Sequence, residues 1–235
     1  MATVEEAEHR RYERSLDRSR VLALSDGVFA IALTLLVLEL RVPDTNGGSA
    51  AEVLQRSHSP LIAFLISFAV IASAWANHRD LFEVIRLTDR NLVWLNLFYL
   101  LPLTMIPFGA ALLSRYEFDP AALTIYGGLL LAIALLRLWI WLYATNRPRL
   151  LFEPVDEELR KAGVMLVVVP ICLYVVAIVV AQLGRAGAAI SLAIYALIPV
   201  LYFVTIIFTP PELRLLTGHR RASENGGSGD EPDTD

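Results

Sequence analysis

Residues 20–40 read Arg20-Val-Leu-Ala-Leu24-Ser25-Asp26-Gly27-Val-Phe-Ala-Ile31-Ala-Leu-Thr34-Leu35-Leu-Val-Leu38-Glu39-Leu. A helix needs about 20 mostly apolar residues to cross the hydrocarbon core of a bilayer. This stretch supplies them, and the carboxylate of Asp26 lies near its beginning. We expect a spanning helix rather than a cleaved signal peptide, because the apolar run is long and no small-residue cleavage site ends it.

Five further stretches have the same length and apolar character. Together with the first, they predict an all-α polytopic membrane protein with six transmembrane helices at residues 21–40, 60–76, 92–113, 121–145, 163–183 and 186–208. Only Gly184, Arg185 and their neighbours separate the last two spans, which predicts a tight helical hairpin. We divide the chain into an N-terminal segment (1–20), a six-helix unit (21–208) and a tail (209–235). The tail is expected to be disordered from about residue 223, because its Gly, Ser and acidic residues cannot bury a core.

Composition excludes several classes of protein. Of the 235 residues, 56% are hydrophobic and 19% are charged, which argues against an ordinary soluble globule. A net charge of -4 gives no overall basic character, so we expect no nucleic-acid partner. The single cysteine, Cys172, excludes an intrachain disulfide and a multi-cysteine metal site, and we expect it to be buried. The chain carries no HExxH, GxSxG or Gly-rich phosphate loop, so we expect no catalytic residues, metal or cofactor.

Basic residues are distributed unevenly between the two sides of the six spans. Fifteen Lys and Arg residues lie in the segments on the side of the N-terminus, and four lie in those on the opposite side. Cytoplasmic loops carry the excess of Lys and Arg. We therefore expect a multi-pass protein of the cell (inner) membrane with both termini in the cytoplasm.

The first span has two distinct faces when its residues are placed at 100° intervals. One narrow stripe contains Gly27, Ile31, Thr34, Leu35 and Leu38, and Ser25 and Asp26 point away from it. On periodicity alone such a stripe is typical of ordinary helix packing, although it would also suit the lining of a pore.

A second polar group lies at the end of the second span, in the sequence Trp75-Ala-Asn-His78-Arg-Asp. It is expected at the depth of Ser25 and Asp26, so Asp26 could pair with His78 or Arg20. A carboxylate inside a membrane must be paired or face water. The pairing would serve as a structural clasp, or as a clasp that positions a pore helix or senses pH.

These residues resemble the signature of the transmembrane protein 175 family. Arg20-x-x-x-Leu24-Ser25-Asp26 is similar to the family's Arg-x-x-x-Phe-Ser-Asp, with Leu24 where Phe is usual. The second span is similar to the family's Trp-x-x-His-x-x-x-Phe, and the third span is also similar to its counterpart. The residues that carry these two likenesses are Trp75, His78 and Phe82, then Asn91 to Leu97, Leu101-Pro102 and Pro107-Phe108. The likeness covers about residues 20–208 and is strongest over 20–110.

The resemblance implies a potassium-permeable channel, because the family comprises endolysosomal potassium channels of animals and shorter prokaryotic homologues. The pore is lined by the first helix of each six-helix unit. Animal members carry two units and dimerise, so one unit implies a homotetramer in membrane lipid with K+ as the permeant ion. By position the apolar constriction is Ile31, Leu35 and Leu38, with Gly27, Thr34 and Glu39 flanking the pore. Arg20, Ser25, Asp26, Trp75 and His78 correspond to the polar network that holds the pore helix.

An aliphatic constriction predicts modest selectivity for K+ over Na+, because it offers no oxygens to replace the ion's hydration shell. The alternative is a proton-coupled secondary transporter that uses Asp26 and His78 as a proton relay. The sequence shows neither internal repeats nor an evident broken helix, which counts against that alternative. A non-conducting scaffold also stays open.

Overall fold

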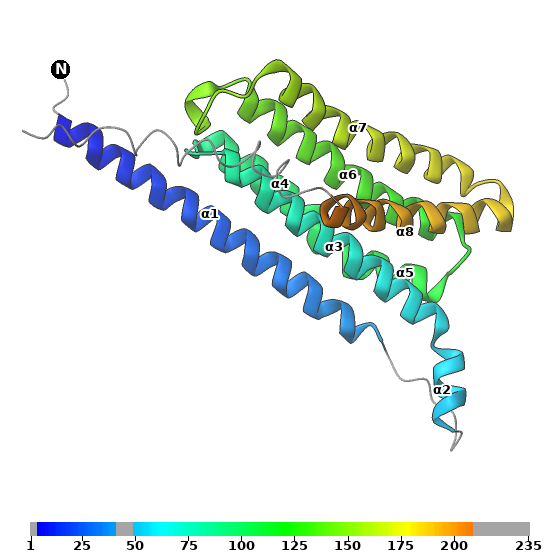
Figure 1. Ribbon diagram of the computed structural model, residues 1–235. Coiled ribbons are helices and arrows are strands. Elements are labelled where there is room, and N and C mark those ends of the chain that lie inside the picture. Colours follow the sequence, from blue (N-terminus) through cyan, green and yellow to red (C-terminus); the bar gives the residue numbers. More distant parts are fainter. Residues whose placement is uncertain (1–3, 41–48, 209–235) are drawn as a thin grey trace, which may run out of the picture. The chain divides into compact units, whose positions relative to one another are not determined.

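The computed structural model describes residues 4–40 and 49–208, and all the secondary-structure elements longer than a single bridge in these two ranges are helices. The helices are α1 (Val4–Leu38), α2 (Ala50–Arg56), α3 (His58–Val84), α4 (Arg90–Thr104), α5 (Ile106–Arg115), α6 (Pro120–Thr145), the 3-10 turn η1 (Pro148–Leu150), α7 (Glu157–Val180) and α8 (Gly184–Phe208) (Figure 1). The contacts between residues group Met1–Pro199 into one unit and Val200–Asp235 into another, so the division falls within α8. The predicted disordered tail lies outside the described residues.

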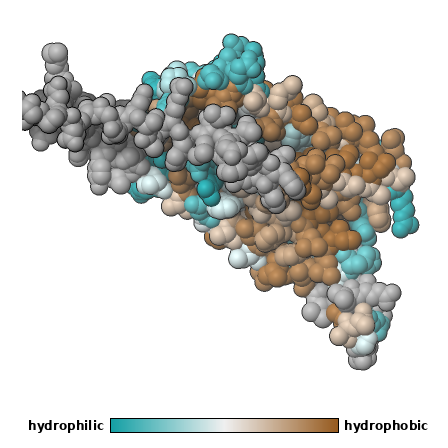
Figure 2. Space-filling model, in the orientation of Figure 1, coloured by the Kyte–Doolittle hydropathy of each residue, from teal (hydrophilic) through white to brown (hydrophobic). Residues whose placement is uncertain are grey.

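Six helical segments are long and apolar enough to cross a membrane, which confirms the predicted all-helical, multi-pass architecture. They are Arg18–Leu38, His58–Val84, Arg90–Arg115, Pro120–Thr145, Glu157–Val180 and Gly184–Val204. The second extends eight residues beyond its predicted end at residue 76 and carries the polar group around His78 inside its helix. Figure 2 shows apolar residues over much of the visible face and hydrophilic residues near the connection between α6 and α7.

The third span is broken, contrary to the expectation of unbroken helices. Helix α4 ends at Thr104, Met105 forms a turn, and α5 begins at Ile106. Pro107 has no N–H to donate to the carbonyl of Leu103. The Met105 amide donates to the Pro102 carbonyl, three residues back, at 3.2 Å, whereas an amide of an α-helix bonds the carbonyl four residues back. The third span therefore consists of two helices joined by a tight turn.

The last two spans form the predicted tight hairpin. Only three residues separate α7 from α8, and Gly184 begins α8 with a φ of 78°, which favours glycine. Cys172, in contrast, is exposed, and the expectation that it would be buried is wrong. In a spanning helix the lipid tails cover apolar side chains as well as protein does, so a small apolar residue gains little by facing inward.

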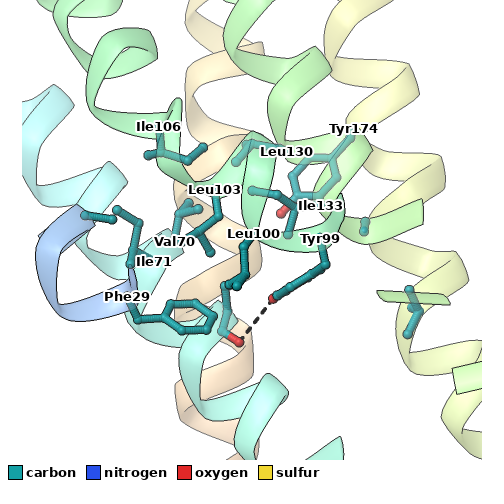
Figure 3. Packing of buried hydrophobic residues seen from close by; sticks show 14 of the residues in the cluster. Phe29, Val70, Ile71, Tyr99, Leu100, Leu103, Ile106, Leu130, Ile133 and Tyr174 are labelled. Atoms are coloured by element: carbon teal, nitrogen blue, oxygen red, sulfur yellow. Dashed lines mark hydrogen bonds between the residues drawn. The ribbon is translucent and has the colours of Figure 1, made fainter. Parts of the chain in front are cut away.

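The core gathers side chains from α1, α3, α4 and α6. Phe29 lies beside Ile71, and both are at most 1% exposed (Figure 3). Leu103 and Leu130 extend the same cluster through α4 and α6. Helix α1 contributes a single row, in which Val21, Ser25, Phe29, Ala32 and Leu36 are all buried. It packs on α3, α4 and α5 through this row.

Candidate pore-lining face and polar network

The stripe predicted on α1 projects away from the rest of the chain. Ile31, Leu35 and Leu38 are 59%, 41% and 67% exposed. They lie on the side of α1 away from its buried row. The three predicted constriction residues thus share one face that no described residue of the same chain covers.

The flanking positions extend this face along the helix. A Cβ built on Gly27 would meet nothing within 4 Å, so the helix is open there. Thr34 is exposed, and its hydroxyl donates to the Ile31 carbonyl at 2.9 Å within the helix. Glu39 follows the end of α1 and is half-buried. The face therefore combines an apolar stripe with few free polar groups and a carboxylate at one end.

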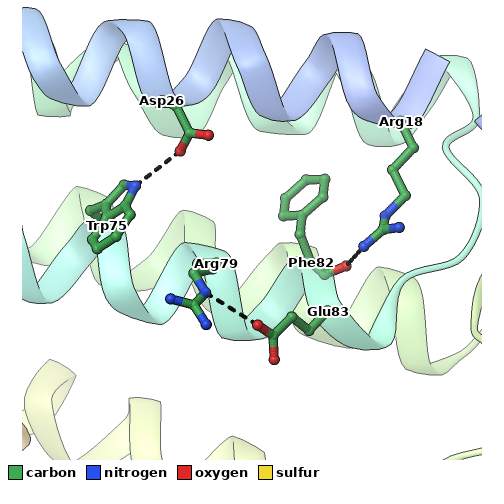
Figure 4. Close-up of polar contacts among 6 residues, drawn as sticks. All are labelled: Arg18, Asp26, Trp75, Arg79, Phe82 and Glu83. Carbon is green, nitrogen blue, oxygen red and sulfur yellow. Dashed lines mark hydrogen bonds and ion pairs between the residues drawn. The ribbon is translucent and has the colours of Figure 1, made fainter. Parts of the chain in front are cut away.

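Asp26 is bound by Trp75, not by His78 or Arg20 as expected. The indole Nε1 of Trp75 donates to Oδ1 of Asp26 at 2.9 Å, joining α3 to α1 (Figure 4). Asp26 and Trp75 are both exposed, and so is Arg20. The carboxylate lies on an open side of α1, where only an indole N–H from the same chain reaches it among the bonds that the structure describes.

His78 belongs to a separate, buried chain of hydrogen bonds. The Nδ2 of Asn96 donates to the Ser25 hydroxyl at 2.9 Å, and Oδ1 of Asn96 lies 2.8 Å from Nε2 of His78. Ser25, Asn96 and His78 are at most 2% exposed. The chain therefore connects α1, α4 and α3 in the interior, at the depth the sequence predicted.

The proton positions in this chain follow from donor and acceptor counts. The Ser25 hydroxyl donates its only hydrogen to the Val21 carbonyl at 2.9 Å. Ser25 must then accept from the amide group of Asn96, which turns the Asn96 oxygen toward His78. The Nε2 of His78 therefore carries a proton and donates it.

Aromatic rings enclose His78 on its remaining sides. The ring of Phe82 stacks on the imidazole with centroids 4.5 Å apart, and that of Tyr99 at 5.5 Å. Phe29 of α1 is also 5.5 Å away. The sequence did not single out Asn96 as a site residue, although it lies in the third-span stretch quoted above. Its signal is an amide in an apolar span at the depth of His78 and Ser25.

No group of three or more His, Cys, Asp or Glu side chains that could hold a metal ion occurs in the described ranges, 4–40 and 49–208. The polar residues of the site are thus arranged in pairs and short chains. This arrangement fastens helices to one another.

Comparison with known proteins gives consistent results. The family model described as "Endosomal/lysosomal potassium channel TMEM175" matches residues 20–107. A potassium channel of Chamaesiphon minutus is 39% identical over 149 residues, which cover 60% of this chain and 73% of that protein. A potassium channel of Streptomyces collinus is 34% identical, covering 62% and 73%. The human endosomal/lysosomal proton channel TMEM175 is 27% identical over 61% of this chain and 29% of its own length.

Solved structures agree. The crystal structure of a lysosomal potassium-selective channel TMEM175 homologue from Chamaesiphon minutus has a TM-score of 0.68 at 30% identity, covering 80% of this chain and 97% of that one. A variant of the potassium channel MtTMEM175 shares the fold, with a TM-score of 0.58 at 18% identity. The chain therefore belongs to the TMEM175 family of membrane proteins.

Proposed function

We propose that this protein is a potassium-permeable channel whose pore is lined by α1 of each subunit. The observation that carries the proposal is the exposed stripe of Ile31, Leu35 and Leu38 on the first span of a TMEM175 family member. Bacterial relatives at 39% and 34% identity are named potassium channels, which supports the same permeant ion here. No catalytic residue or cofactor has a part in this function.

The constriction would act through its lack of polar atoms. Ile31 and Leu38 are seven residues apart, about 10 Å along the helix, so their side chains and Leu35 form a short apolar collar. An aliphatic ring offers an ion nothing in place of water, and such a constriction can close by dewetting. K+ holds its water less tightly than Na+, so it crosses at a smaller penalty and selectivity is modest. Glu39 would raise the cation concentration at the outer mouth.

A homotetramer accounts for the uncovered half of α1. One helix per chain cannot enclose a pore, and the fully buried residues of α1, among those whose burial is described, form one row from Val21 to Leu36. Asp26 lies on the uncovered side, and an ionisable side chain within a membrane span faces protein or water rather than lipid. Neighbouring copies would complete the wall of the pore, and the water-filled vestibule between them would give Asp26 the protein or water contact that it needs.

The third span offers a matching surface for the next subunit. It carries a row of large exposed side chains: Trp94, Phe98, Leu101, Met105 and Phe108. Helix α1 carries a row of mostly small exposed residues: Ala23, Gly27, Ala30, Thr34 and Val37. The hydrogen bond between Ser25 and Asn96, 71 positions apart, aligns the two helices in depth. With this offset, each large residue lies at the depth of one smaller residue.

A symmetry axis along the membrane normal keeps depth unchanged from one subunit to the next. The large row of one copy can therefore pack on the small row of its neighbour, because small residues let membrane helices approach closely. Gly27 and Thr34 lie where the small row meets the pore stripe, and Ile31, Leu35 and Leu38 beside them are left facing the axis.

The polar network would hold α1 in this position. Asp26 bonds Trp75, and Ser25 reaches His78 through Asn96, so two sides of α1 are fastened to α3. Arg20, exposed near the cytoplasmic side, would extend this network in the assembled channel. We place both termini in the cytoplasm and the protein in the cell (inner) membrane, following the excess of arginine on that side.

The proton-coupled transporter is the less favoured function. A relay through Asp26 and His78 would need proton transfer between them, whereas Asp26 bonds Trp75 and His78 bonds Asn96. Transport would give saturable, pH-coupled flux, and a channel gives current proportional to the driving force.

The test is ion flux into liposomes that contain the purified protein, under a K+ or a Na+ gradient. The wild type should pass K+ faster than Na+, and Leu35→Ala should raise Na+ flux because it widens the collar. Leu166→Ala is the matched control, since Leu166 is 67% exposed on α7, away from the proposed pore. Absence of K+ flux would overturn the channel, and equal effects of the two substitutions would remove Leu35 from the constriction.

A further inference from the structure

The carbonyl groups at the end of α3 have unusual partners. The last four carbonyls of a helix lack intrahelical amides, and α3 ends at Val84. In a longer helix the amide of Arg86 would serve the carbonyl of Phe82, but it donates to the Leu150 carbonyl at 2.7 Å. The carbonyl of Phe82 is therefore left for a partner from elsewhere in the chain.

The connection between α6 and α7 supplies part of the replacement. We call residues 146–156 the strap. The amide of Phe152 donates to the Val84 carbonyl at 3.1 Å, and Leu87 donates to Leu150 at 3.1 Å. Ile85 and Leu151 form an antiparallel bridge and are at most 4% exposed. The strap is thus hydrogen-bonded to the end of α3 and covers it.

Arg18 provides the remaining partner and ties α1 to the same place. Its Nη2 donates to the Phe82 carbonyl at 2.8 Å (Figure 4), and its guanidinium carbon lies 5.4 Å from the centre of the Phe152 ring. Arg18 is also the first residue of the first span. One guanidinium therefore contacts α3 and the strap from the first turn of the membrane-spanning part of α1.

The strap reaches the beginning of α4, where Nη2 of Arg149 lies 4.0 Å from Oδ2 of Asp89, a residue that is itself fixed by α6. The Tyr143 hydroxyl donates to both carboxylate oxygens of Asp89, at 2.9 and 3.1 Å, and Asp89 caps α4 through the amide of Leu92. The guanidinium of Arg147 lies 3.8 Å from the centre of the Tyr143 ring. Arg18 thus binds to a structure that several helices fix.

Phe82 connects this link to the buried network. Its carbonyl accepts from Arg18, and its ring stacks on His78, which reaches Ser25 through Asn96. The two attachments hold α1 at Arg18 and at Ser25, about 10 Å apart along the helix. Without the first, the start of the membrane-spanning part of α1 would be held only by the packing of Val21 and by the second attachment.

We propose that Arg18 is a positioning residue of the pore helix: by fastening the cytoplasmic end of the membrane-spanning part of α1 to the strap and to Phe82, it stabilises the conducting alignment of the four α1 helices. The inference rests on the proposed channel function. The constriction begins at Ile31, about 20 Å away along the helix. The link therefore sets how often the pore is open and leaves the choice between K+ and Na+ unchanged.

The experiment compares Arg18→Ala, Phe152→Leu and their double mutant by single-channel recording in bilayers. Hydrogen bonds to charged groups are among the stronger ones, so we expect Arg18→Ala to lower the open-to-closed ratio about tenfold, with an unchanged K+/Na+ permeability ratio. The double mutant should lose no more than Arg18→Ala, because both changes break one link. Arg18→Lys keeps a donor for the Phe82 carbonyl and should restore part of the open probability.

Arg79→Ala is the matched control. Arg79 is exposed at the same end of α3 and bonds Glu83 of its own helix at 3.2 Å, so its loss removes the same charge without freeing α1. It should leave the open probability unchanged. An unchanged open probability in Arg18→Ala, or a strictly additive double mutant with Phe152→Leu, would overturn the proposal.

Hydrogen exchange of the α1 amides just after Arg18 supplies a readout that does not need current. Exchange should accelerate in Arg18→Ala and Phe152→Leu and stay at the wild-type rate in Arg79→Ala. Unchanged exchange in Arg18→Ala would refute the link whether or not the protein conducts. A wild type that carries no K+ current would instead refute the proposed function, and the gating role with it.

Discussion

Replacing Asn96 with leucine tests the buried chain of hydrogen bonds most directly. The two side chains have similar size, so packing changes little, but leucine offers no donor or acceptor. Ser25 then loses its incoming hydrogen bond, and Nε2–H of His78 loses its acceptor, at sites at most 2% exposed. The substitution therefore leaves the N–H of His78 without an acceptor and removes the bond that Ser25 accepts, while Ser25 still donates to the Val21 carbonyl.

The magnitude follows from these two groups. Each unsatisfied buried group costs about 1–3 kcal/mol in water-soluble proteins. Between membrane helices the hydrogen bonds average about 0.6 kcal/mol, because the unfolded chain also finds partners. Both residues here are at most 2% exposed, and aromatic rings surround His78, so neither group has much freedom to find a new partner. We expect Asn96→Leu to lower the free energy of unfolding by about 2–3 kcal/mol. This value lies between the total for two groups on the membrane-helix scale and the upper total for two groups on the soluble-protein scale.

Unfolding of the purified protein by denaturing detergent, followed by circular dichroism, measures this change. Asn77→Leu is the control, since Asn77 donates to the Ser73 carbonyl in its own helix and bridges no helices. It should cost less than about 1 kcal/mol. If the two substitutions destabilise the protein equally, the chain from Ser25 to His78 does not stabilise the bundle and the reasoning fails.

Two other features can be tested in the same preparation. In a cysteine-free background, Ala30→Cys with Leu101→Cys should give disulfide-linked oligomers up to tetramers. The pair Ala30→Cys with Trp94→Cys is about 10 Å out of register and should not crosslink. Crosslinking of the second pair alone would contradict the proposed interface. Gly127→Ala should destabilise the protein by about 1–3 kcal/mol, because the new methyl would collide with Ile178 of α7 and Tyr195 of α8. Gly128→Ala meets open space and should be neutral or slightly stabilising in thermal unfolding, so equal losses at both positions would count against close packing at Gly127.

Much of the candidate site was predictable because it depends on local properties of α1. The angular positions of Ile31, Leu35 and Leu38 follow from helix geometry alone, and the structure places all three on one exposed face. The depth of His78 relative to Ser25 followed from the lengths of the apolar runs. The partner of Asp26 could not be predicted in this way. Asp26 bonds Trp75 rather than His78, because the direction and packing of the side chains, and not their depth, decide which of them meet.

The sequence by itself determined the six spanning helices, since a bilayer requires about 20 apolar residues whose backbone groups are satisfied within the helix. Both conditions can be read from consecutive residues. Only the tertiary structure decided that Asn96 joins Ser25 to His78, that the third span breaks at Met105, and that Arg18 binds the carbonyl of Phe82. Every residue carries a carbonyl, so a backbone acceptor leaves no mark in the sequence. Which carbonyl is free depends on where a helix ends and on which distant segment folds over it.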